Sequence, residues 1–473
     1  METVGCKNIK KFACIEKELN LFERSYNGFF YWQHIRIQVC ESLFGNRIEN
    51  EKKERNKRKR RIVNTIIEVC KGFIESIKLD FHLFWGDANR KLLFFRGPTS
   101  SDKFLDTWNL PDNITVSNYR LVSCLCDSNI GDYFLEEPIL LTAIEKRVRN
   151  IFKLIKKDTA ERKFLDKLER RFRNDFGQTL SADDMEQYIN YFKIMDKHYS
   201  RMYRRIFRYS KCKAIAFECY YSNALYPAQR IARESGIAIV ELQHGVINNH
   251  EAYWFEDSRG INNYVPDFFL TFGEIHNKWI KLVNGAQPIA VGFPYQEQCI
   301  KEVQSVATNE KEIIIYPESD PHYEEILNEF IDKITPMGYH VYVKIHPLES
   351  TNVSIWYPLL VKNQYVEIVT DQSMGIYYWL KRAKHHIMAS TTVGLEAVAL
   401  NHPNVCIATN MPHEQVQCLL DWKIARGFST VQQLIDLILD PIDLNNKIAR
   451  TVREKLWKSN ASANITMFFS ELL

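Results

Sequence analysis

Two short apolar segments of the sequence, 341–345 and 387–389, lead directly into polar side chains that could bind a phosphate. Lys344 lies near the end of the first segment, and His346 follows it. The second segment is followed by three hydroxyl side chains: Ser390, Thr391 and Thr392. A hydroxyl cluster that opens a helix offers free N–H groups and the positive end of the helix dipole to an anion. These residues therefore predict a site for a phosphorylated ligand, and a nucleotide is the simplest such ligand.

The elements that must position these residues are parallel strands. Both apolar segments have the length and the β-branched content of buried strands. Strand–helix alternation is regular from 213 onward and continues on both sides of a connection near 295–311. This pattern predicts an α/β fold with two doubly wound Rossmann-type domains that face a cleft. Ligands of such sheets bind beyond the carboxyl ends of the strands, so we expect the ligand in that cleft.

Two further polar residues, Glu318 and Ser319, follow the strand expected at 312–316. They lie at the same expected edge as His346 and are weaker candidates for contacts with the ligand. The alternative is that they cap a loop or the helix that follows.

Glu218 and His244 follow two strands that are expected earlier in the chain, at 214–217 and 237–242. A transfer to a hydroxyl group needs a base that removes its proton, and a histidine or a carboxylate can do so near neutral pH. We expect His244 or Glu218 to be this base. The alternatives are a buried structural histidine and a salt bridge from the carboxylate to a neighbouring cation.

The pattern of strands and helices divides the sequence into four parts. They are a helical N-terminal extension at 1–90, an α/β domain at 91–295 with a helical insertion at about 142–209, a second α/β domain at 311–445, and a helix at 446–473 that packs back on the first α/β domain. The insertion is charged and periodic, as is typical of long amphipathic helices.

The N-terminal extension holds two groups of interest. Trp32 and Arg36 lie in an aromatic helical segment, where they could stack on a sugar and hold an anion; an ordinary packed amphipathic helix is the alternative. A basic run at 52–61 precedes an apolar helical stretch, which is typical of a solvated face. It could also bind an anionic membrane surface.

Composition narrows the class of protein. The 473 residues include 62 basic and 58 acidic side chains, and a net charge of +4 does not favour nucleic-acid binding. Eleven cysteines without a repeated C-x-x-C pattern predict reduced thiols and a cytoplasmic location. No apolar run approaches the roughly 18 residues of a spanning helix. We therefore expect a soluble protein or one that is peripheral at the inner face of the cell membrane.

Four motifs carry a resemblance to a known group of enzymes: ELQHGV at 241–246, GFP at 292–294, KIHP at 344–347 and STTVGLEA at 390–397. Together they resemble bacterial surface-polysaccharide glycosyltransferases of GT-B fold, in particular the capsule-polysaccharide biosynthesis proteins that include Kdo transferases. CDP-glycerol glycerophosphotransferases and sialyltransferases with an HP motif are similar in pattern. The likeness covers roughly 210–420.

The resemblance implies roles for individual residues. His346 and the hydroxyl cluster would bind the nucleotide phosphates of a donor, Glu396 would contact the ribose, and Gly292 would lie at the donor site. His244 would face the cleft and take part in catalysis. No clear DxD motif is present, and GT-B enzymes generally need no metal. A nucleotide-sugar would then be the co-substrate, with no metal and no other cofactor.

The leading hypothesis is a glycosyltransferase that moves a sugar from a nucleotide-sugar donor to a surface polysaccharide, either capsule or lipopolysaccharide O-antigen. Its acceptor would be a glycan or a lipid-linked glycan. The alternatives are a CDP-polyol phosphotransferase, a nucleotide-sugar epimerase of the same two-domain fold, and a binding protein without activity.

Overall fold

The computed structural model describes residues 4–44, 91–96, 116–120, 133–134, 137–151, 158–245, 264–280, 286–350, 352–400, 404–411, 416–441 and 447–473. The chain forms two compact units. The first comprises Met1–Thr271, Asn277–Ala290 and Ser462–Leu473, and the second comprises Phe272–His276 and Val291–Ala461. The domain limits expected from the sequence stay a prediction, and the basic run at 52–61 lies outside the described residues.

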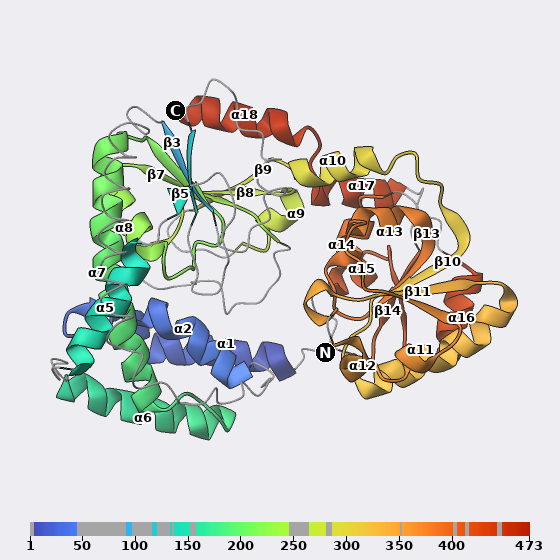
Figure 1. Cartoon of the computed structure of the whole chain (residues 1–473), viewed down its shortest axis with the longest axis horizontal. Helices are drawn as coiled ribbons and strands as arrows, with labels where there is room; N and C mark the ends of the chain where they lie inside the picture. The colour runs from blue at the N-terminus through green and yellow to red at the C-terminus, as the bar shows by residue number, and fades with distance from the viewer. Residues whose placement is uncertain are drawn as a thin grey trace. The chain divides into compact units, whose positions relative to one another are not determined.

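The first unit contains a parallel sheet that, within the described residues, has the strand order β5-β4-β3-β6-β7-β8-β9 (Figure 1). Its strands are β3 (Leu92–Arg96), β4 (Val116–Arg120), β5 (Tyr133–Phe134), β6 (Ala214–Phe217), β7 (Ala238–Leu242), β8 (Phe268–Thr271) and β9 (Gln287–Ala290). All four side chains of β6 are buried, as expected for a strand inside a parallel sheet.

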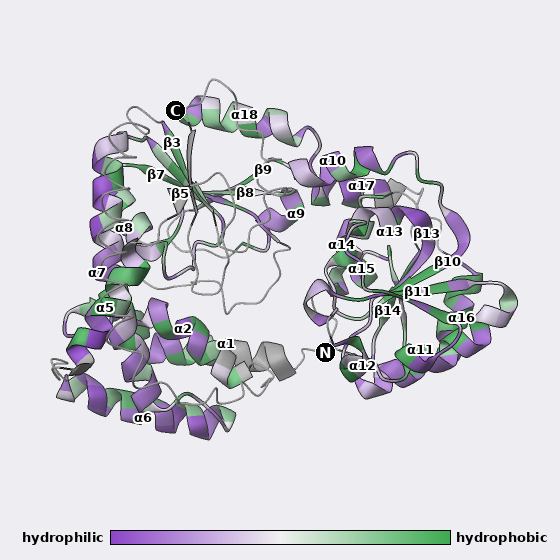
Figure 2. Ribbon diagram, viewed as in Figure 1, coloured by the Kyte–Doolittle hydropathy of each residue, from purple (hydrophilic) through white to green (hydrophobic). Residues whose placement is uncertain are grey.

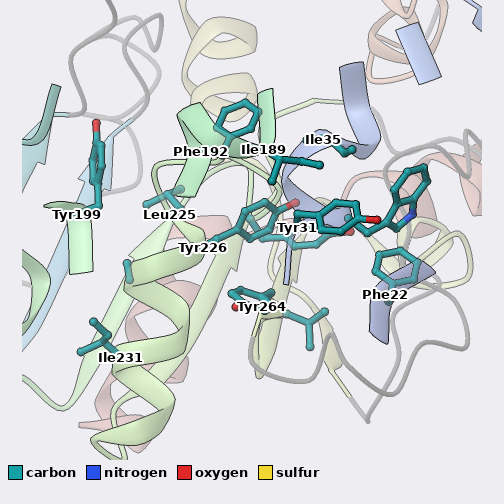
Figure 3. Close-up of a cluster of buried hydrophobic side chains, with 14 of the residues drawn as sticks. Phe22, Tyr31, Ile35, Ile189, Phe192, Tyr199, Leu225, Tyr226, Ile231 and Tyr264 are labelled. Carbon is teal, nitrogen blue, oxygen red and sulfur yellow. The ribbon is translucent and has the colours of Figure 1, made fainter. Parts of the chain in front are cut away.

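Helices surround this sheet and form a helical layer at its side: α1 (Val4–Glu18), α2 (Trp32–Phe44), α5 (Glu137–Ile151), α6 (Thr159–Phe176), α7 (Ala182–Ser210) and α8 (Tyr226–Glu234). The short segments η1 (Leu21–Glu23), β1 (Ser25–Tyr26) and β2 (Phe29–Phe30) join α1 to α2. Figure 3 shows aromatic and aliphatic side chains packed together, among them Tyr31, which precedes α2, Ile35 of α2, Phe192 of α7 and Tyr226 of α8.

The longest helix, α7, follows from local sequence. Ser181 caps its first turn by accepting the N–H of Asp184 at 3.1 Å, and the helix ends where Lys211 adopts a left-handed conformation with φ 53°. Its buried side chains recur at helical spacing and include Met185, Ile189, Phe192, Met202 and Ile206.

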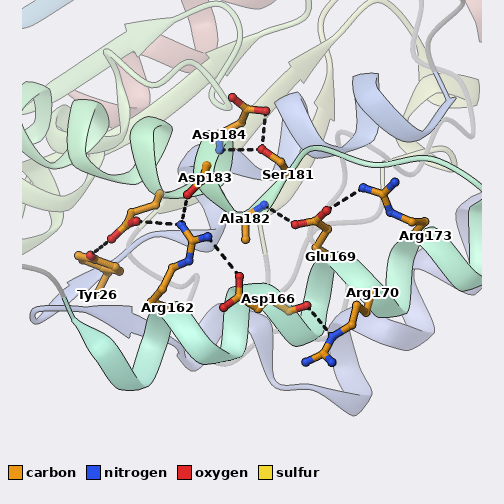
Figure 4. Close-up of polar contacts among 11 residues, drawn as sticks. Tyr26, Arg162, Asp166, Glu169, Arg170, Arg173, Ser181, Ala182, Asp183 and Asp184 are labelled. Atoms are coloured by element: carbon orange, nitrogen blue, oxygen red, sulfur yellow. Dashed lines mark hydrogen bonds and ion pairs between the residues drawn. The ribbon is translucent and has the colours of Figure 1, made fainter.

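The hairpin of α6 and α7 is joined by charged side chains, which Figure 4 shows. Arg162 of α6 donates to Glu186 of α7 at 3.0 Å, and the Glu169 carboxylate accepts the Ala182 N–H at 2.8 Å. A carboxylate at the start of α7 also complements the helix dipole.

The second unit contains a parallel sheet that has, in the described residues, the order β12-β11-β10-β13-β14-β15. Its strands are β10 (Asn309–Ile315), β11 (His340–Lys344), β12 (Val366–Val369), β13 (Ala383–Met388), β14 (Asn404–Ala408) and β15 (Arg426–Phe428). Figure 2 shows its central strands as mainly hydrophobic.

Helices lie on both faces of the second sheet (Figure 1). They are α10 (Pro294–Glu302), α11 (Pro321–Ile334), α12 (Val353–Trp356), α13 (Ile376–Arg382), α14 (Val393–Ala397), α15 (Gln417–Asp421), α16 (Val431–Leu439) and α17 (Lys447–Leu456), with 3-10 turns η4 (Thr335–Met337), η5 (Pro347–Glu349) and η6 (Leu360–Lys362). The short α9 (Glu274–Asn277) begins in the Phe272–His276 segment of this unit, and its last residue, Asn277, belongs to the first unit.

The last helix, α18 (Ala461–Leu472), belongs to the first unit from Ser462 onward. Its Phe468 packs edge-on against Phe268 of β8, with ring centroids 5.4 Å apart, and Lys213 donates to the backbone oxygen of Leu473 at 2.9 Å. The expected α/β class with two doubly wound parallel sheets is confirmed.

Candidate functional site

The second sheet has a topological switch point between β10 and β13. From β10 the chain adds β11 and β12 on one side, and it then returns to place β13 on the other side. Ligands of doubly wound sheets bind at the carboxyl end of such a switch point. The residues that follow β10 and β13 are therefore those that a ligand of this sheet would meet.

Glu318 and Ser390 come together at this switch point. Glu318 Oε1 accepts the Ser390 hydroxyl at 2.6 Å and the Ser390 N–H at 3.2 Å. A carboxylate repels a phosphate, so this geometry fits Glu318 for holding the start of the hydroxyl loop rather than for touching an anion. Ser319, the other polar residue predicted here, is exposed.

The other two hydroxyl residues, Thr391 and Thr392, lie half-buried just before α14. Thr391 Oγ1 accepts the Val393 N–H at 3.4 Å, whereas Thr392 occupies the N-cap position without a side-chain cap. Gly394 lets α14 approach β13 closely, because a Cβ there would lie 2.9 Å from both Met388 and Leu419. The three predicted hydroxyl residues thus form one loop beside Glu318.

His346 follows β11, the strand next to β10, and its side chain is exposed. Lys344 is 7% exposed, and its Nζ donates to the Asp371 backbone oxygen at 3.0 Å and to Gln372 Oε1 at 2.7 Å. Desolvation lowers the pKa of this amine. Both acceptors follow β12, which two strands separate from β13, so Lys344 joins β11 to that loop. This corrects the expectation that Lys344 converges with Ser390 on the ligand.

Glu396 of α14 lies among three tyrosines of the second unit: Tyr295, Tyr316 and Tyr377. Desolvation raises the pKa of its carboxyl to about 7, although the residue as a whole is partly exposed. Tyr377 hydrogen-bonds to this carboxyl and also accepts Gln296 Nε2 at 3.1 Å. Glu396 is therefore close to half-protonated near neutral pH.

This raised pKa predicts a pH-dependent effect of Glu396→Gln. The native protein holds a proton that the unfolded chain releases near its ordinary pKa of 4.5, so rising pH destabilises the wild type until about pH 7. Between these two pH values, the free energy of unfolding of the variant should rise relative to that of the wild type by at most about 1.4 kcal/mol per pH unit. Above them the difference should stay constant. Thermal unfolding from pH 4.5 to 8.5 measures it.

The control for this experiment is Glu329→Gln, which changes an exposed glutamate of α11 that pairs with Lys333. We expect its difference from the wild type to stay constant over the same range. A constant difference for Glu396→Gln would show that the Glu396 carboxyl titrates alike in the folded and the unfolded chain.

Gly292 has a packing role that corrects its expected place at the donor site. Its φ is 102°, and a Cβ would lie 2.3 Å from the backbone oxygen of Lys458 and 2.7 Å from the Ala461 Cβ. The neighbouring Phe293 stacks on Phe272 with ring centroids 4.1 Å apart. The GFP turn therefore holds the segment that leads from α17 to α18.

In the first unit, Glu218 and His244 follow the adjacent parallel strands β6 and β7. Phe217 pairs with Glu241 in register, so Glu218 and the residues after Leu242 lie at one edge of the sheet. Glu218 is 7% exposed, while His244 is exposed, with its ring 6.4 Å from that of Tyr221. The sheet thus brings both predicted bases to one edge.

The pKa values of two side chains at this edge, His244 and Glu241, are shifted from their ordinary values. Desolvation by the surrounding protein lowers the pKa of the His244 imidazole, while the residue as a whole is exposed. Burial raises the pKa of Glu241 well above its ordinary range, and the nearby Glu218 adds to this effect. A neutral imidazole beside a buried carboxyl can accept a proton from a substrate hydroxyl.

Glu241 was not predicted from the sequence as a site residue. Its carboxylate is 1% exposed and accepts the Tyr220 N–H at 2.8 Å. The sequence does contain a sign of its unusual position, because an acidic residue interrupts the otherwise apolar strand AIVEL. A buried acid in a strand needs hydrogen-bond partners or a proton, and either requirement marks it as unusual.

Trp32 and Arg36 do not line an acceptor surface. Trp32 is 0% exposed and donates its indole N–H to Glu16 at 2.6 Å, and Arg36 is 2% exposed and pairs with the same carboxylate at 2.6 Å. A sugar cannot stack on a fully buried ring. This corrects the acceptor role expected for both residues and favours the alternative of a packed helix.

In the part of the chain that the structure describes, no group of three or more His, Cys, Asp or Glu side chains is arranged to hold a metal ion. None of the helices in this part of the chain has both the length and the apolar composition to cross a membrane.

The chain matches no known family profile and no curated protein sequence. Among solved structures, a putative UDP-N-acetylglucosamine 2-epimerase from Listeria monocytogenes aligns with a TM-score of 0.48 at 9% identity, over 81% of this chain and 96% of that one. UDP-GlcNAc 2-epimerase from Methanocaldococcus jannaschii gives 0.44 at 14% identity, over 81% and 99%. The glycosyltransferase SnogD from Streptomyces nogalater gives 0.45 at 12% identity, over 81% and 100%.

Proposed function

We propose that the protein is a glycosyltransferase that takes a sugar from a nucleotide-sugar donor. The observation that supports this most is the hydroxyl loop at the β10/β13 switch point, which Glu318 holds at its start. An anionic ligand at that loop would meet the half-buried hydroxyl residues Thr391 and Thr392, and the exposed imidazole of His346 lies at the same edge of the sheet. These are the groups that suit a diphosphate.

The two units would divide the reaction between them. The second unit would bind the donor and stabilise the charge on the departing nucleotide, which needs no metal if the loop and His346 supply the donors. The first unit would supply His244 or Glu218 as the base that removes the proton of the acceptor hydroxyl. The sugar carbon would then bond to that oxygen as its bond to the donor phosphate breaks.

The proposed acceptor is a glycan of the cell surface, capsule or lipopolysaccharide, either free or lipid-linked. The four motifs support this part of the proposal, since they resemble surface-polysaccharide glycosyltransferases. Membrane contact through 52–61 and a peripheral location belong to the same proposal.

A thermal-shift screen with CMP, CDP, UDP and GDP tests the donor site. A nucleotide at 100 times its dissociation constant should stabilise the wild type by about 2.7 kcal/mol. His346→Ala should lose that shift, because it removes the exposed imidazole at the carboxyl end of β11, at the same edge of the sheet as the loop. His340→Ala, which changes an exposed histidine at the start of β11 and so at the opposite edge of the sheet, is the control and should keep the shift.

The products then separate the candidate reactions. Release of nucleotide that depends on an added glycan supports the transferase. An isomerised nucleotide-sugar formed without acceptor would instead show an epimerase, and CMP release from a CDP-polyol a phosphotransferase. If no nucleotide stabilises the wild type at millimolar concentration, the proposal is wrong.

A further inference from the structure

A buried carboxyl fixes the backbone that follows β6. Glu241 is the next-to-last residue of β7, and its Oε2 accepts the N–H of Tyr220 at 2.8 Å. The N–H of Cys219 also hydrogen-bonds to this carboxyl. Both N–H groups belong to the two residues directly after Glu218, so the carboxyl sits beneath the turn that carries the candidate base.

The conformation of this turn needs such support. Cys219 has φ 67°, in the left-handed region that costs a side chain about 1–2 kcal/mol. A residue there keeps this conformation only when the surrounding structure imposes it. The two N–H groups held by Glu241 supply part of that constraint.

The other bonds of the turn come from neighbouring elements. The Tyr220 backbone oxygen accepts Gln229 Nε2 of α8 at 2.6 Å, and the Cys219 oxygen accepts the Ser222 N–H at 2.9 Å. Further along, the Asn223 amide donates to the His34 backbone oxygen at 3.1 Å. Gln229 of α8 thus holds the Tyr220 oxygen of the turn, α2 holds the Asn223 side chain that follows it, and Glu241 holds the N–H side of the turn.

We propose that Glu241 is a positioning residue, whose carboxyl fixes the Cys219–Tyr220 backbone and thereby the place of Glu218 relative to His244. The inference rests on the proposed function, since it assigns Glu241 to the base of that reaction. It differs from a catalytic role because the carboxyl is 1% exposed and its bonds go to backbone rather than toward a substrate.

The charge state of Glu241 allows an experiment to distinguish a positioning role of this residue from a catalytic one. Burial and the nearby Glu218 raise the pKa of this carboxyl well above its ordinary range, which favours its uncharged form. A glutamine has the same shape, is also neutral, and keeps an oxygen that can accept both N–H groups. It therefore retains the positioning bonds and loses the titratable proton.

Steady-state kinetics of Glu241→Gln and Glu241→Ala give the first test. The glutamine variant should keep the wild-type kcat and pH profile. The alanine variant should lose about 100-fold in kcat, since a misplacement of about 1 Å costs that much, with an unchanged KM for the donor. Equal losses in both variants, or no loss in the alanine variant, would overturn the proposal.

Amide hydrogen exchange on the full chain gives a test that does not depend on activity. The Tyr220 N–H should exchange slowly in the wild type and in Glu241→Gln, and faster in Glu241→Ala. Equal rates in the three proteins would overturn the inference, whatever reaction the protein catalyses. If the alanine variant does not fold, Glu241→Asp replaces it, because the side chain is then one methylene too short to reach Tyr220.

Discussion

Arg36→Ala is expected to lower the free energy of unfolding of the first unit by about 3–5 kcal/mol. The guanidinium is 2% exposed and donates to the Glu16 carboxylate at 2.6 Å from Nε and at 3.0 Å from Nη2. Without it, a carboxylate that is 5% exposed keeps its charge in an apolar layer that includes Phe12 and Trp32. Urea unfolding, followed by circular dichroism, measures the loss.

The matched control is Arg173→Ala, which removes an exposed arginine of α6 that pairs with Glu169 at 2.7 Å. A pair of this kind on a helix surface contributes only about 0.2–0.5 kcal/mol. If Arg36→Ala instead kept the midpoint of unfolding and lost only activity, Arg36 would have the acceptor role that its sequence pattern suggested.

Gly292→Ala is expected to destabilise the second unit by about 3–5 kcal/mol, through overpacking and backbone strain together. The new Cβ would meet the Lys458 backbone oxygen at 2.3 Å, and a backbone atom cannot rotate away as the end of a side chain can. The φ of 102° adds strain for any residue with a Cβ. Differential scanning calorimetry of the full chain should show the affected transition at a lower temperature.

Gly338→Ala separates the two contributions. Gly338 has φ 83°, and its added Cβ would meet no atom within 4 Å, so only the backbone strain of about 1–2 kcal/mol remains. A loss in Gly292→Ala no larger than this would mean that the segment from Lys458 to Ala461 moves aside at little cost. Gly292 would then be available for the donor contact expected from its motif.

The sheets could be predicted because their signal is local. Buried parallel strands read as short β-branched runs, and the runs that contain Val341 and Ile387 lie in β11 and just at the end of β13. Polar residues at the carboxyl ends follow from the same pattern. This is why His346, Ser390 and Glu318 could be assigned to one edge before any coordinates existed.

The direction of individual side chains could not be predicted. Lys344 has the type and the position of a phosphate ligand, but its Nζ is held by Asp371 and Gln372, which lie far along the sequence. Trp32 and Arg36 have the composition of a sugar-binding wall, and Glu16 of another helix buries them. In each case a partner distant in sequence decides the role, and periodicity carries no information about it.

For Glu241 and Gly292 the sequence does contain a local sign of an unusual position, but the role of each residue could not be predicted from it. An acid within an apolar strand and a glycine before Phe-Pro both indicate special geometry. The geometry itself depends on the Cys219–Tyr220 turn and on the segment at Lys458, which only the folded chain supplies.

The assignment of Ser462–Leu473 to the first unit has a consequence for biosynthesis. The sheet of that unit is translated early, but α18, which covers Phe268 of β8, emerges only after the whole of the second unit. At 5–20 residues per second, the ribosome needs roughly 10–40 s to pass from Thr271 to Ser462. Throughout that interval the nascent first unit lacks the helix that covers Phe268, and this is the period in which a chaperone would have its largest effect.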